Sequence, residues 1–395
     1  MGTLASGDWL SRERAIRVAV ISGLVSLGIL AYLLGSSSGT LDWSGRPLGT
    51  DFSQVWTAGR MALEGRPAEV WDWGAHRAVQ EAFHGPALSE WYGWHYPPPF
   101  LLVAAALAAL PYLPALVAWQ AATLIPFAWL LRRFTGRPEA WLFVLAAPAT
   151  LICVLHGHNG FLTALLLGGG LMLLEKRPFI AGLLLGCLVY KPQFALLLPL
   201  LLLVLGNWRA IAGAAVSSLA LIGVTLALWG WPVWQAFLDS LPLSQSIVIE
   251  QGRTGWEKIM SPFAAVRSWG GTVDVAYAVQ AAFTIASIGL TLWLARTARP
   301  DVRNAAVTAA VLISTPYVLD YDFVVLLAGI AFLWRDAARH GWLSWEETAL
   351  ALVWIAPLVA RNIAAVTLIP IDLLTALLVL ALAVRRQLTA SPSRH

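Results

Sequence analysis

VAVISGLVSLGILAYLL, residues 18–34, is an uncharged apolar run that directly follows a segment containing Arg12, Arg14 and Arg17. A run of about 20 mostly apolar residues is long enough to cross a bilayer as a helix. The alternative is a cleaved signal peptide, but the run is long for one, and the GSSSGT that follows it lacks a clear A-x-A cleavage site. We therefore expect an uncleaved first span with its N-terminus on the cytoplasmic side.

Similar apolar runs recur along all 395 residues, of which 58% are hydrophobic and only 12% are charged. Soluble domains carry about a quarter charged residues, and we find no alternating segments of about ten residues that a membrane barrel would need. The sequence therefore predicts an all-α multi-pass membrane protein with one domain over residues 1–395 and about 12 spans. The predicted spans are 15–35, 114–131, 140–155, 161–174, 178–190, 193–206, 210–229, 275–295, 304–319, 323–334, 346–360 and 363–384.

The run 97–111, which begins at YPPPFLLV (96–103), is ambiguous, because it could cross the membrane or lie on the outer face as a short helix. If it does not cross, the basic clusters of the later loops fall on the same side as the N-terminus. The positive-inside rule favours this topology. For the same reason the net charge of +4 indicates orientation and not nucleic-acid binding. The clusters are Arg132/Arg133/Arg137, Lys176/Arg177, Arg209, Arg296/Arg299/Arg303, Arg335/Arg339 and Arg385/Arg386.

This topology places almost every unusual polar residue on the outer side, whereas the inner loops are short and basic. The two large outer loops are 36–113 and 230–274. The short outer turns are HGHNG (156–160), the turn around Lys191, TPYVLDYD (315–322) and Arg361–Asn362. We therefore expect the functional site at the outer face.

Asp51 lies in GTDFSQVW (49–56), just after the first span. A carboxylate beside a membrane bundle is costly unless it has a partner or a task. It could act as a general base that takes a proton from an attacking hydroxyl. It could equally be a helix N-cap, because FSQVWTAGRMALEG (52–65) has helical periodicity and ends at a glycine.

The first outer loop is rich in aromatic residues, among them Trp71, Trp73 and Trp91. WYGWHYPPPF (91–100) also carries Trp94, His95 and Tyr96 before three prolines that predict a rigid turn. An interfacial aromatic belt explains most of the 21 tryptophans of the chain. Stacking of sugar rings on indole faces is the functional alternative.

Two short motifs interrupt apolar runs with polar side chains. HGHNG supplies His156, His158 and Asn159, which suit a hydroxyl-rich ligand better than a metal, because no third metal ligand is nearby in the sequence. YKPQ (190–193) supplies Lys191 and Gln193. The lysine could snorkel to the interface or bind a lipid phosphate.

The remaining candidates lie in the later outer segments. Arg253, Lys258 and Arg267 of loop 230–274 could bind phosphate. TPYVLDYD adds Asp320, Tyr321 and Asp322 at the point where a span meets the outside, and each carboxylate could instead pair with one of the cations.

Taken in order, GTDF, the AGR step with its terminal EGRP, YPPPF, HGHNG, YKPQ and TPYVLDYD resemble glycosyltransferase family 87 of the GT-C superfamily. This family includes bacterial α-1,2-mannosyltransferases. The resemblance covers about residues 45 to 365, and the ordered set of motifs is more specific than any single motif. One departure is Gly157-His158, where the family often has Gly-Gln.

The resemblance implies a GT-C-type helical bundle whose long first outer loop carries juxtamembrane helices. It implies an inverting transfer of a hexose, typically mannose, from a polyprenyl-phosphate-sugar donor to a glycan or glycolipid acceptor at the outer face of the plasma membrane. Asp51 matches the catalytic carboxylate of the family, and no metal or cofactor is expected. The substrate-binding set that we expect is Phe52, Trp94, His95, Tyr96, His156, His158, Asn159, Lys191, Gln193, Arg253, Lys258, Tyr321 and Asp322.

Two other classes use a similar set of residues. A transporter or flippase for lipid-linked sugars would need the same aromatic and cationic side chains, but it should also show internal repeats and polar residues at mid-membrane depth. A non-catalytic subunit of a polymer-assembly system would keep the fold without needing the base. The gathering of polar residues on one side favours an enzyme that works at one face.

Overall fold

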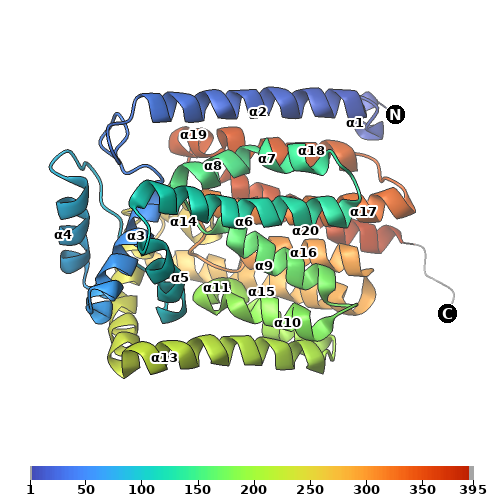
Figure 1. Ribbon diagram of the computed structural model, residues 1–395. Coiled ribbons are helices and arrows are strands. Elements are labelled where there is room, and N and C mark those ends of the chain that lie inside the picture. Colours follow the sequence, from blue (N-terminus) through green and yellow to red (C-terminus); the bar gives the residue numbers. More distant parts are fainter. Residues whose placement is uncertain (1, 391–395) are drawn as a thin grey trace.

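The computed structural model describes residues 2–390 and is built from helices (Figure 1). Within these residues there is no β-strand, and three isolated β-bridges are the only strand-like pairings. Residue 1 and residues 391–395, the ends of the predicted domain, lie outside the described part. The helices are α1 (Thr3–Ser6), α2 (Arg12–Gly35), α3 (Thr50–Leu63), α4 (Trp73–His84), α5 (Pro98–Ala108), α6 (Tyr112–Thr135), α7 (Ala140–Leu145), α8 (Pro148–His156), α9 (Gly160–Leu173), α10 (Pro178–Gly186), α11 (Pro192–Ala195), α12 (Leu197–Val204), α13 (Trp208–Ser244), α14 (Pro262–Ser268), α15 (Val273–Thr297), α16 (Pro300–Ile313), α17 (Leu326–His340), α18 (Glu346–Ile355), α19 (Pro357–Thr367) and α20 (Ile371–Thr389), with short η segments at Pro67–Trp71, Cys187–Tyr190, Gln245–Glu250 and Asp320–Val325.

Four helices, α2, α6, α13 and α15, are long and apolar enough to cross a membrane. The pair α18 and α19 passes the same test together, although it bends by 72°. Shorter apolar helices pack beside them, as α9 does against α6 and α10 does against α13. The protein is therefore a multi-pass membrane protein with four to five candidate spans by helix length.

Several predicted spans are broken helices. The run 140–155 is divided into α7 and α8, because Pro148 begins α8 where the preceding helix cannot continue. The run 193–206 is divided at Leu196 into α11 and α12, and Pro199 lies in the first turn of α12. The prediction of a turn at Arg361–Asn362 is wrong. Both residues lie inside α19, and the chain turns later, between Thr367 and Ile371, where Pro370 precedes α20.

The ambiguous run 97–111 forms α5, which has 11 residues and is therefore about 16 Å long. This length is too short to cross a bilayer, as the charge pattern predicts. The helix packs closely against α3. Gly59 allows the two helix backbones to approach closely, because a Cβ atom at this position would lie 2.0 Å from the carbonyl oxygen of Ala104. The glycine of the AGR step thus lets α5 lie against α3.

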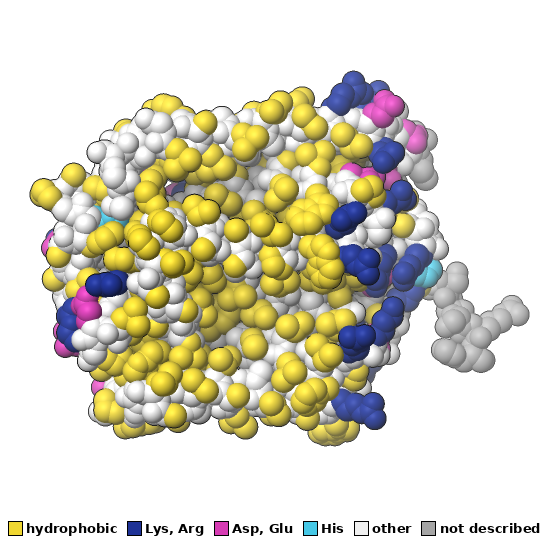
Figure 2. All heavy atoms as spheres, viewed as in Figure 1, with side chains coloured by type: hydrophobic (Ala, Val, Ile, Leu, Met, Phe, Trp, Pro, Cys, Tyr) yellow, Lys and Arg dark blue, Asp and Glu magenta, His cyan; other side chains and the backbone are white. Residues whose placement is uncertain are grey.

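The two ends of the bundle differ in charge. Helix α1 and the last turn of α20 lie at one end in Figure 1, and Lys and Arg side chains gather at that end in Figure 2, whereas apolar side chains cover the middle. We call this the basic end; it includes the last turns of α6, α15, α17 and α20, which contain Arg132, Arg296, Arg339 and Arg386. We call the opposite end the Asp51 end; it includes α3, α4, and the loops 251–260 and 314–319.

The long first loop is an ordered cap at the Asp51 end, held together by a buried polar network. The His84 ring bonds the Thr40 hydroxyl at 2.7 Å and the Ser53 hydroxyl at 2.9 Å. Ser53 also donates to Gln80, whose side-chain amide bonds both the N–H and the C=O of Tyr92. The network joins residues 40, α3, α4 and the segment 91–96, so the cap has a defined shape over the end of the bundle.

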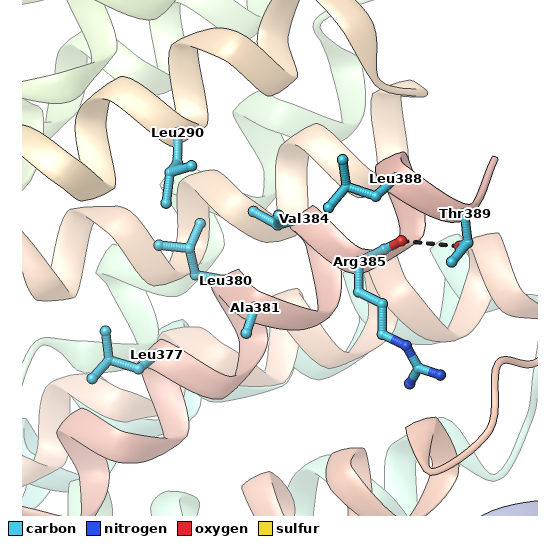
Figure 3. A pocket seen from close by; sticks show the side chains of 8 residues that line it. All are labelled: Leu290, Leu377, Leu380, Ala381, Val384, Arg385, Leu388 and Thr389. Carbon is cyan, nitrogen blue, oxygen red and sulfur yellow. Dashed lines mark hydrogen bonds between the residues drawn. The ribbon is translucent and has the colours of Figure 1, made fainter. Parts of the chain in front are cut away.

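An apolar groove of about 680 Å³ lies between α15 and α20 (Figure 3). Leucine, valine and alanine side chains line it, and Arg385 and Thr389 lie where α20 approaches the basic end. Because its lining contains no carboxylate or histidine, this groove has no groups for acid–base chemistry.

Candidate active site

Asp51 lies in the first turn of α3, at the edge of the cap. The N-cap of α3 is Gly49, in the left-handed region at φ 69°, and no side chain caps the helix. The interpretation of Asp51 as an N-cap is therefore wrong. Its carboxylate instead lies 3.4 Å from the Gln54 side-chain nitrogen and 3.6 Å from Nδ1 of His156.

The Asp51 carboxylate has no lysine or arginine within ion-pair distance among residues 2–390, and its side chain is 14% exposed. Burial raises its pKa from 3.8 to about 7. The charges of Lys258 and Arg361 oppose this rise, and those of Asp320 and Asp322 add to it. A carboxylate with this pKa can both take up and release a proton near neutral pH.

His156 lies between Asp51 and an arginine, and its hydrogen bonds define its tautomer. Nη2 of Arg361 lies 2.8 Å from Nε2, and because a guanidinium only donates, Nε2 must be the accepting nitrogen. The ring is then neutral with its proton on Nδ1, which lies 2.7 Å from the Thr50 hydroxyl. The N–H of His156 therefore points to the side of the ring where Asp51 lies.

Arg361 is fixed by Asp320, which is 1% exposed. The guanidinium bonds the carboxylate through Nε at 2.6 Å and Nη2 at 2.5 Å. The other oxygen of Asp320 accepts from the backbone N–H of Tyr321. Burial raises the pKa of Asp320 above its ordinary value, and Arg361 opposes this rise. Asp320 thus pairs with a cation, as one reading of the sequence predicts, but its partner comes from α19.

A second polar cluster lies deeper, around Lys191. Nζ of Lys191 donates to Asp322 at 2.5 Å and to Asn159 at 3.1 Å, and the side chains of the lysine and of Asp322 are 3% and 2% exposed. Snorkelling of Lys191 to the interface is therefore wrong, because a buried carboxylate holds the ammonium. Nδ2 of Asn159 has no partner within the described chain, so this cluster keeps an unused donor.

His158 joins the deep cluster to the cap. Its Nε2 bonds the hydroxyl of Tyr96 at 3.1 Å, and its ring stacks on Tyr321 with centroids 3.6 Å apart. Burial holds its pKa well below the ordinary value, so the ring is neutral. Its Nδ1 lies 3.9 Å from Asp322 and has no hydrogen-bond partner in residues 2–390.

The loops 251–260 and 314–322 pair through their backbones and bring Lys258 to the site. Met260 donates to Val318 at 2.9 Å, and Asp320 donates to the carbonyl of Lys258 at 3.1 Å. The Lys258 cation acts on Asp51 more strongly than any other charge. Arg253 is exposed, whereas Arg267 bonds the backbone carbonyls of Glu250 and Gly271 and so organises the loop.

Other residues that the sequence singles out lie in packing positions. Phe52 is fully buried, with its ring 5.4 Å from that of Tyr112, and Trp94 is fully buried and stacks on Phe100. Gln193 is half-buried and makes no hydrogen bond among the described side chains. Phe52 and Trp94 therefore shape the site from behind, since neither side chain reaches a free surface.

Three residues that the structure places at the site were missing from the sequence-based set: Thr50, Gln54 and Arg361. Thr50 adjoins Asp51, and Gln54 lies inside the quoted GTDFSQVW, so proximity in the chain was an available signal. Arg361 had a weaker signal, an arginine in an apolar segment, because its partners His156 and Asp320 are far away in sequence.

The fold and the site together define a multi-pass helical membrane protein with a recessed, titratable carboxylate beneath an ordered cap at one end of its bundle. A family model, that of glycosyltransferase family 87, matches residues 94–319, more than half of the chain. The chain belongs to this family and is a membrane glycosyltransferase. No significant match exists among curated proteins or among solved structures. The matched range includes HGHNG, YKPQ and Lys258 but neither Asp51 nor Arg361, so the roles of those two residues rest on the structure.

Proposed function

We propose that this glycosyltransferase moves a hexose, with mannose the first candidate, from a polyprenyl-phosphate-sugar donor to a hydroxyl of a glycan or glycolipid acceptor, with inversion. The observation that carries the proposal is the state of Asp51: a recessed carboxylate without a cationic partner in ion-pair contact, whose pKa of about 7 suits a general base. The lipid-linked donor fits a site at the end of a membrane bundle.

The proposed reaction assigns one task to Asp51. The acceptor hydroxyl gives its proton to the carboxylate while its oxygen forms a bond to the anomeric carbon. The bond from that carbon to the phosphate oxygen breaks, and the lipid phosphate leaves with the electron pair. Lys258, the cation that acts most strongly on Asp51, would stabilise the negative charge that develops on the phosphate.

His156 would keep the base in position. Its neutral ring lies between Asp51 and Arg361, so the guanidinium charge does not contact the base directly. A direct ion pair would hold the carboxylate ionised but would also weaken it as a base, because an adjacent cation lowers a carboxyl pKa. The histidine therefore separates the cation from Asp51 while connecting the two.

The charge of the two ends supports an orientation. Basic residues favour the cytoplasmic side, so we propose that the basic end faces the cytoplasm and that the Asp51 end faces outward across the plasma membrane. The donor and the acceptor would then both meet the enzyme at the outer face.

The test is sugar transfer by purified protein in lipid vesicles, with radiolabelled polyprenyl-phosphate-mannose and, in parallel, the glucose, galactose and arabinose donors. We expect transfer by the wild type and a loss of about a thousandfold in Asp51→Asn, because general-base catalysis contributes about 10²- to 10⁴-fold. Asp72→Asn is the matched control, since it changes an exposed capping carboxylate of the same cap, and asparagine caps equally well.

The outcomes distinguish a glycosyltransferase that uses Asp51 as its base from a transporter of lipid-linked sugars. Transfer by Asp51→Asn at the wild-type rate would contradict the proposed base. Broken helices also occur in transporters, so the same vesicles are assayed for movement of the labelled donor between leaflets. Movement of the donor without transfer of any of the four sugars would contradict the proposed reaction.

A further inference from the structure

Four partly exposed rings form a continuous series in the cap, which we call the aromatic ladder: Tyr317, His95, Trp73 and Trp91. The centroids of successive rings are 6.2, 5.3 and 5.9 Å apart. The successive planes are inclined by 63°, 85° and 74°, so neighbouring rings meet edge to face, and each ring keeps part of its surface exposed.

The ladder begins near Asp51 and ends at the protein surface. Tyr317 is the first ring, and it lies in loop 314–319, whose backbone pairs with the loop that carries Lys258 and which leads into Asp320. Arg361 joins Asp320 to His156, which lies 3.6 Å from Asp51. Burial raises the pKa of the Tyr317 hydroxyl, and the Asp51 charge adds to this rise. Trp91 is the last ring, and the guanidinium of Arg77 lies over it at 5.9 Å. Arg77 pairs with Glu81 in solvent, since both side chains are about half exposed.

Hydrogen bonds hold the rings of the aromatic ladder in place. Gln80 bonds both backbone groups of Tyr92 and so fixes the segment next to Trp91. Nδ1 of His95 bonds the hydroxyl of Ser244 at the end of α13, which ties the middle of the ladder to the bundle. A pre-formed site of this kind loses little conformational entropy when a ligand binds.

These tryptophans differ from those of a membrane belt. Belt tryptophans lie on the outer surface of the bundle, as Trp129, Trp208 and Trp231 do at 52%, 68% and 60% exposure. The ladder rings are only partly exposed, lie in the cap and lead to the proposed base.

We propose that the aromatic ladder binds successive sugar units of the acceptor, so that the acceptor is a saccharide chain whose terminal unit reaches Asp51. The spacing of the rings is about the length of one sugar unit in a chain, and the exposed parts of the rings can pack against the apolar faces of sugar rings. This proposal rests on the proposed function, because it takes Asp51 as the base at the end of the chain.

The experiment measures saccharide binding without requiring transfer. The full-length protein in nanodiscs is titrated with the methyl glycoside, the disaccharide and the trisaccharide of the mannose, glucose and galactose series, and saturation-transfer NMR reports Kd. We expect tighter binding with each added unit in the preferred series. Trp73→Ala should raise the Kd of the trisaccharide about tenfold, while Trp73→Phe should restore most of the affinity.

The variants also test the direction of the ladder. Trp91→Ala should weaken the trisaccharide but leave the methyl glycoside unchanged, because one sugar unit does not reach the outer rung. Trp43→Ala is the control, since this tryptophan is 69% exposed on the same cap and lies outside the ladder.

Equal affinity for one and three sugar units, an unchanged Kd in Trp73→Ala, or no saccharide binding by the wild type would each overturn the ladder. Length-dependent binding without any sugar transfer would keep the ladder and contradict the proposed reaction. Transfer that is unchanged in the Trp73→Ala and Trp91→Ala variants would keep the reaction and overturn the ladder.

Discussion

Asp336 at the basic end and Asp51 at the opposite end are both shielded carboxylates near the termini of helices, but their partners differ. Asp336 is 1% exposed and accepts from Nε and Nη2 of Arg299 at 2.7 and 2.6 Å and from Arg386 at 2.6 Å. Asp51 has a neutral amide and a neutral histidine for neighbours. The same functional group is thus saturated with cations at one end and left without one at the other.

The difference separates a structural carboxylate from a reactive one. Arg386 also bonds Glu346, so two buried acids and one buried arginine connect α17, α18 and α20 at the basic end. A carboxylate held this way stays ionised and gives up no lone pair to a substrate. Asp51 keeps its oxygens available, and burial without a direct counter-ion raises its pKa to about 7.

Removing the arginine shared by the buried ion pairs of the basic end should produce the largest loss of stability. Arg386→Met leaves Asp336 and the fully buried Glu346 short of their shared cation, and removing one partner of a buried pair costs about 3–5 kcal/mol. Thermal unfolding in detergent should show this loss, whereas the transfer rate per folded molecule should not change.

Glu346→Gln in the Arg386→Met background is the matched rescue, because it removes one of the two stranded charges and should recover part of the stability. A stable Arg386→Met protein with a lower transfer rate would break the comparison, since the basic end would then take part in the reaction.

Neutralising Asp51, at the opposite end, should raise the stability of the protein instead of lowering it. The folded state raises the pKa of Asp51 from 3.8 to about 7, so the folded protein binds this proton more tightly than the unfolded chain does. The wild type should therefore lose stability as pH rises from about 4 to about 7 and lose no more above that. Asp51→Asn removes this loss and should be more stable by about 2–4 kcal/mol at pH 8.

The gain should shrink as pH falls towards 4 and disappear below that pH, because the unfolded chain, in which the Asp51 pKa is 3.8, takes up the proton only there. Thermal unfolding of both proteins from pH 4 to pH 8 measures it. A gain that is independent of pH, or a loss at pH 8, would show that Asp51 is a structural carboxylate like Asp336.

Breaking the connection between Arg361 and Asp51 should lower the transfer rate less than the loss of Asp51 itself does. Arg361→Met frees Nε2 of His156 and removes a positive charge that favours ionised Asp51. We expect the transfer rate at pH 7 to fall about tenfold, a change of about 1.4 kcal/mol in the barrier. Arg66→Met, which breaks an exposed ion pair of the cap, is the control and should leave the rate unchanged. An equal rate in Arg361→Met would remove the positioning role of His156.

The sequence was most informative for properties that depend only on the order of residues along the chain. Apolar run length predicts membrane helices, and the distribution of arginines predicts that 97–111 forms a short helix at one end. Helix boundaries were less predictable in the continuous apolar segment 346–384, because nothing in it marks the late turn except Pro370.

The site was predictable as a set of segments but not as a set of contacts. Asp51 stood out because a carboxylate is rare beside a membrane. Lys191 also stood out, but its partner Asp322 is 131 residues away, and only packing brings the two together. Phe52 and Trp94 looked accessible because the sequence does not show which face of an apolar helix or turn is covered.

The pH dependence of kcat/KM for sugar transfer tests the central claim, that Asp51 is a base left without a direct cationic partner, because it reports the pKa of the free enzyme's essential base. We predict an acidic limb with a midpoint near pH 7 in the wild type. In Lys258→Met the midpoint should move to higher pH, because the lysine charge lowers the pKa of Asp51. A limb near pH 4, or a midpoint that stays in place without Lys258, would contradict the account.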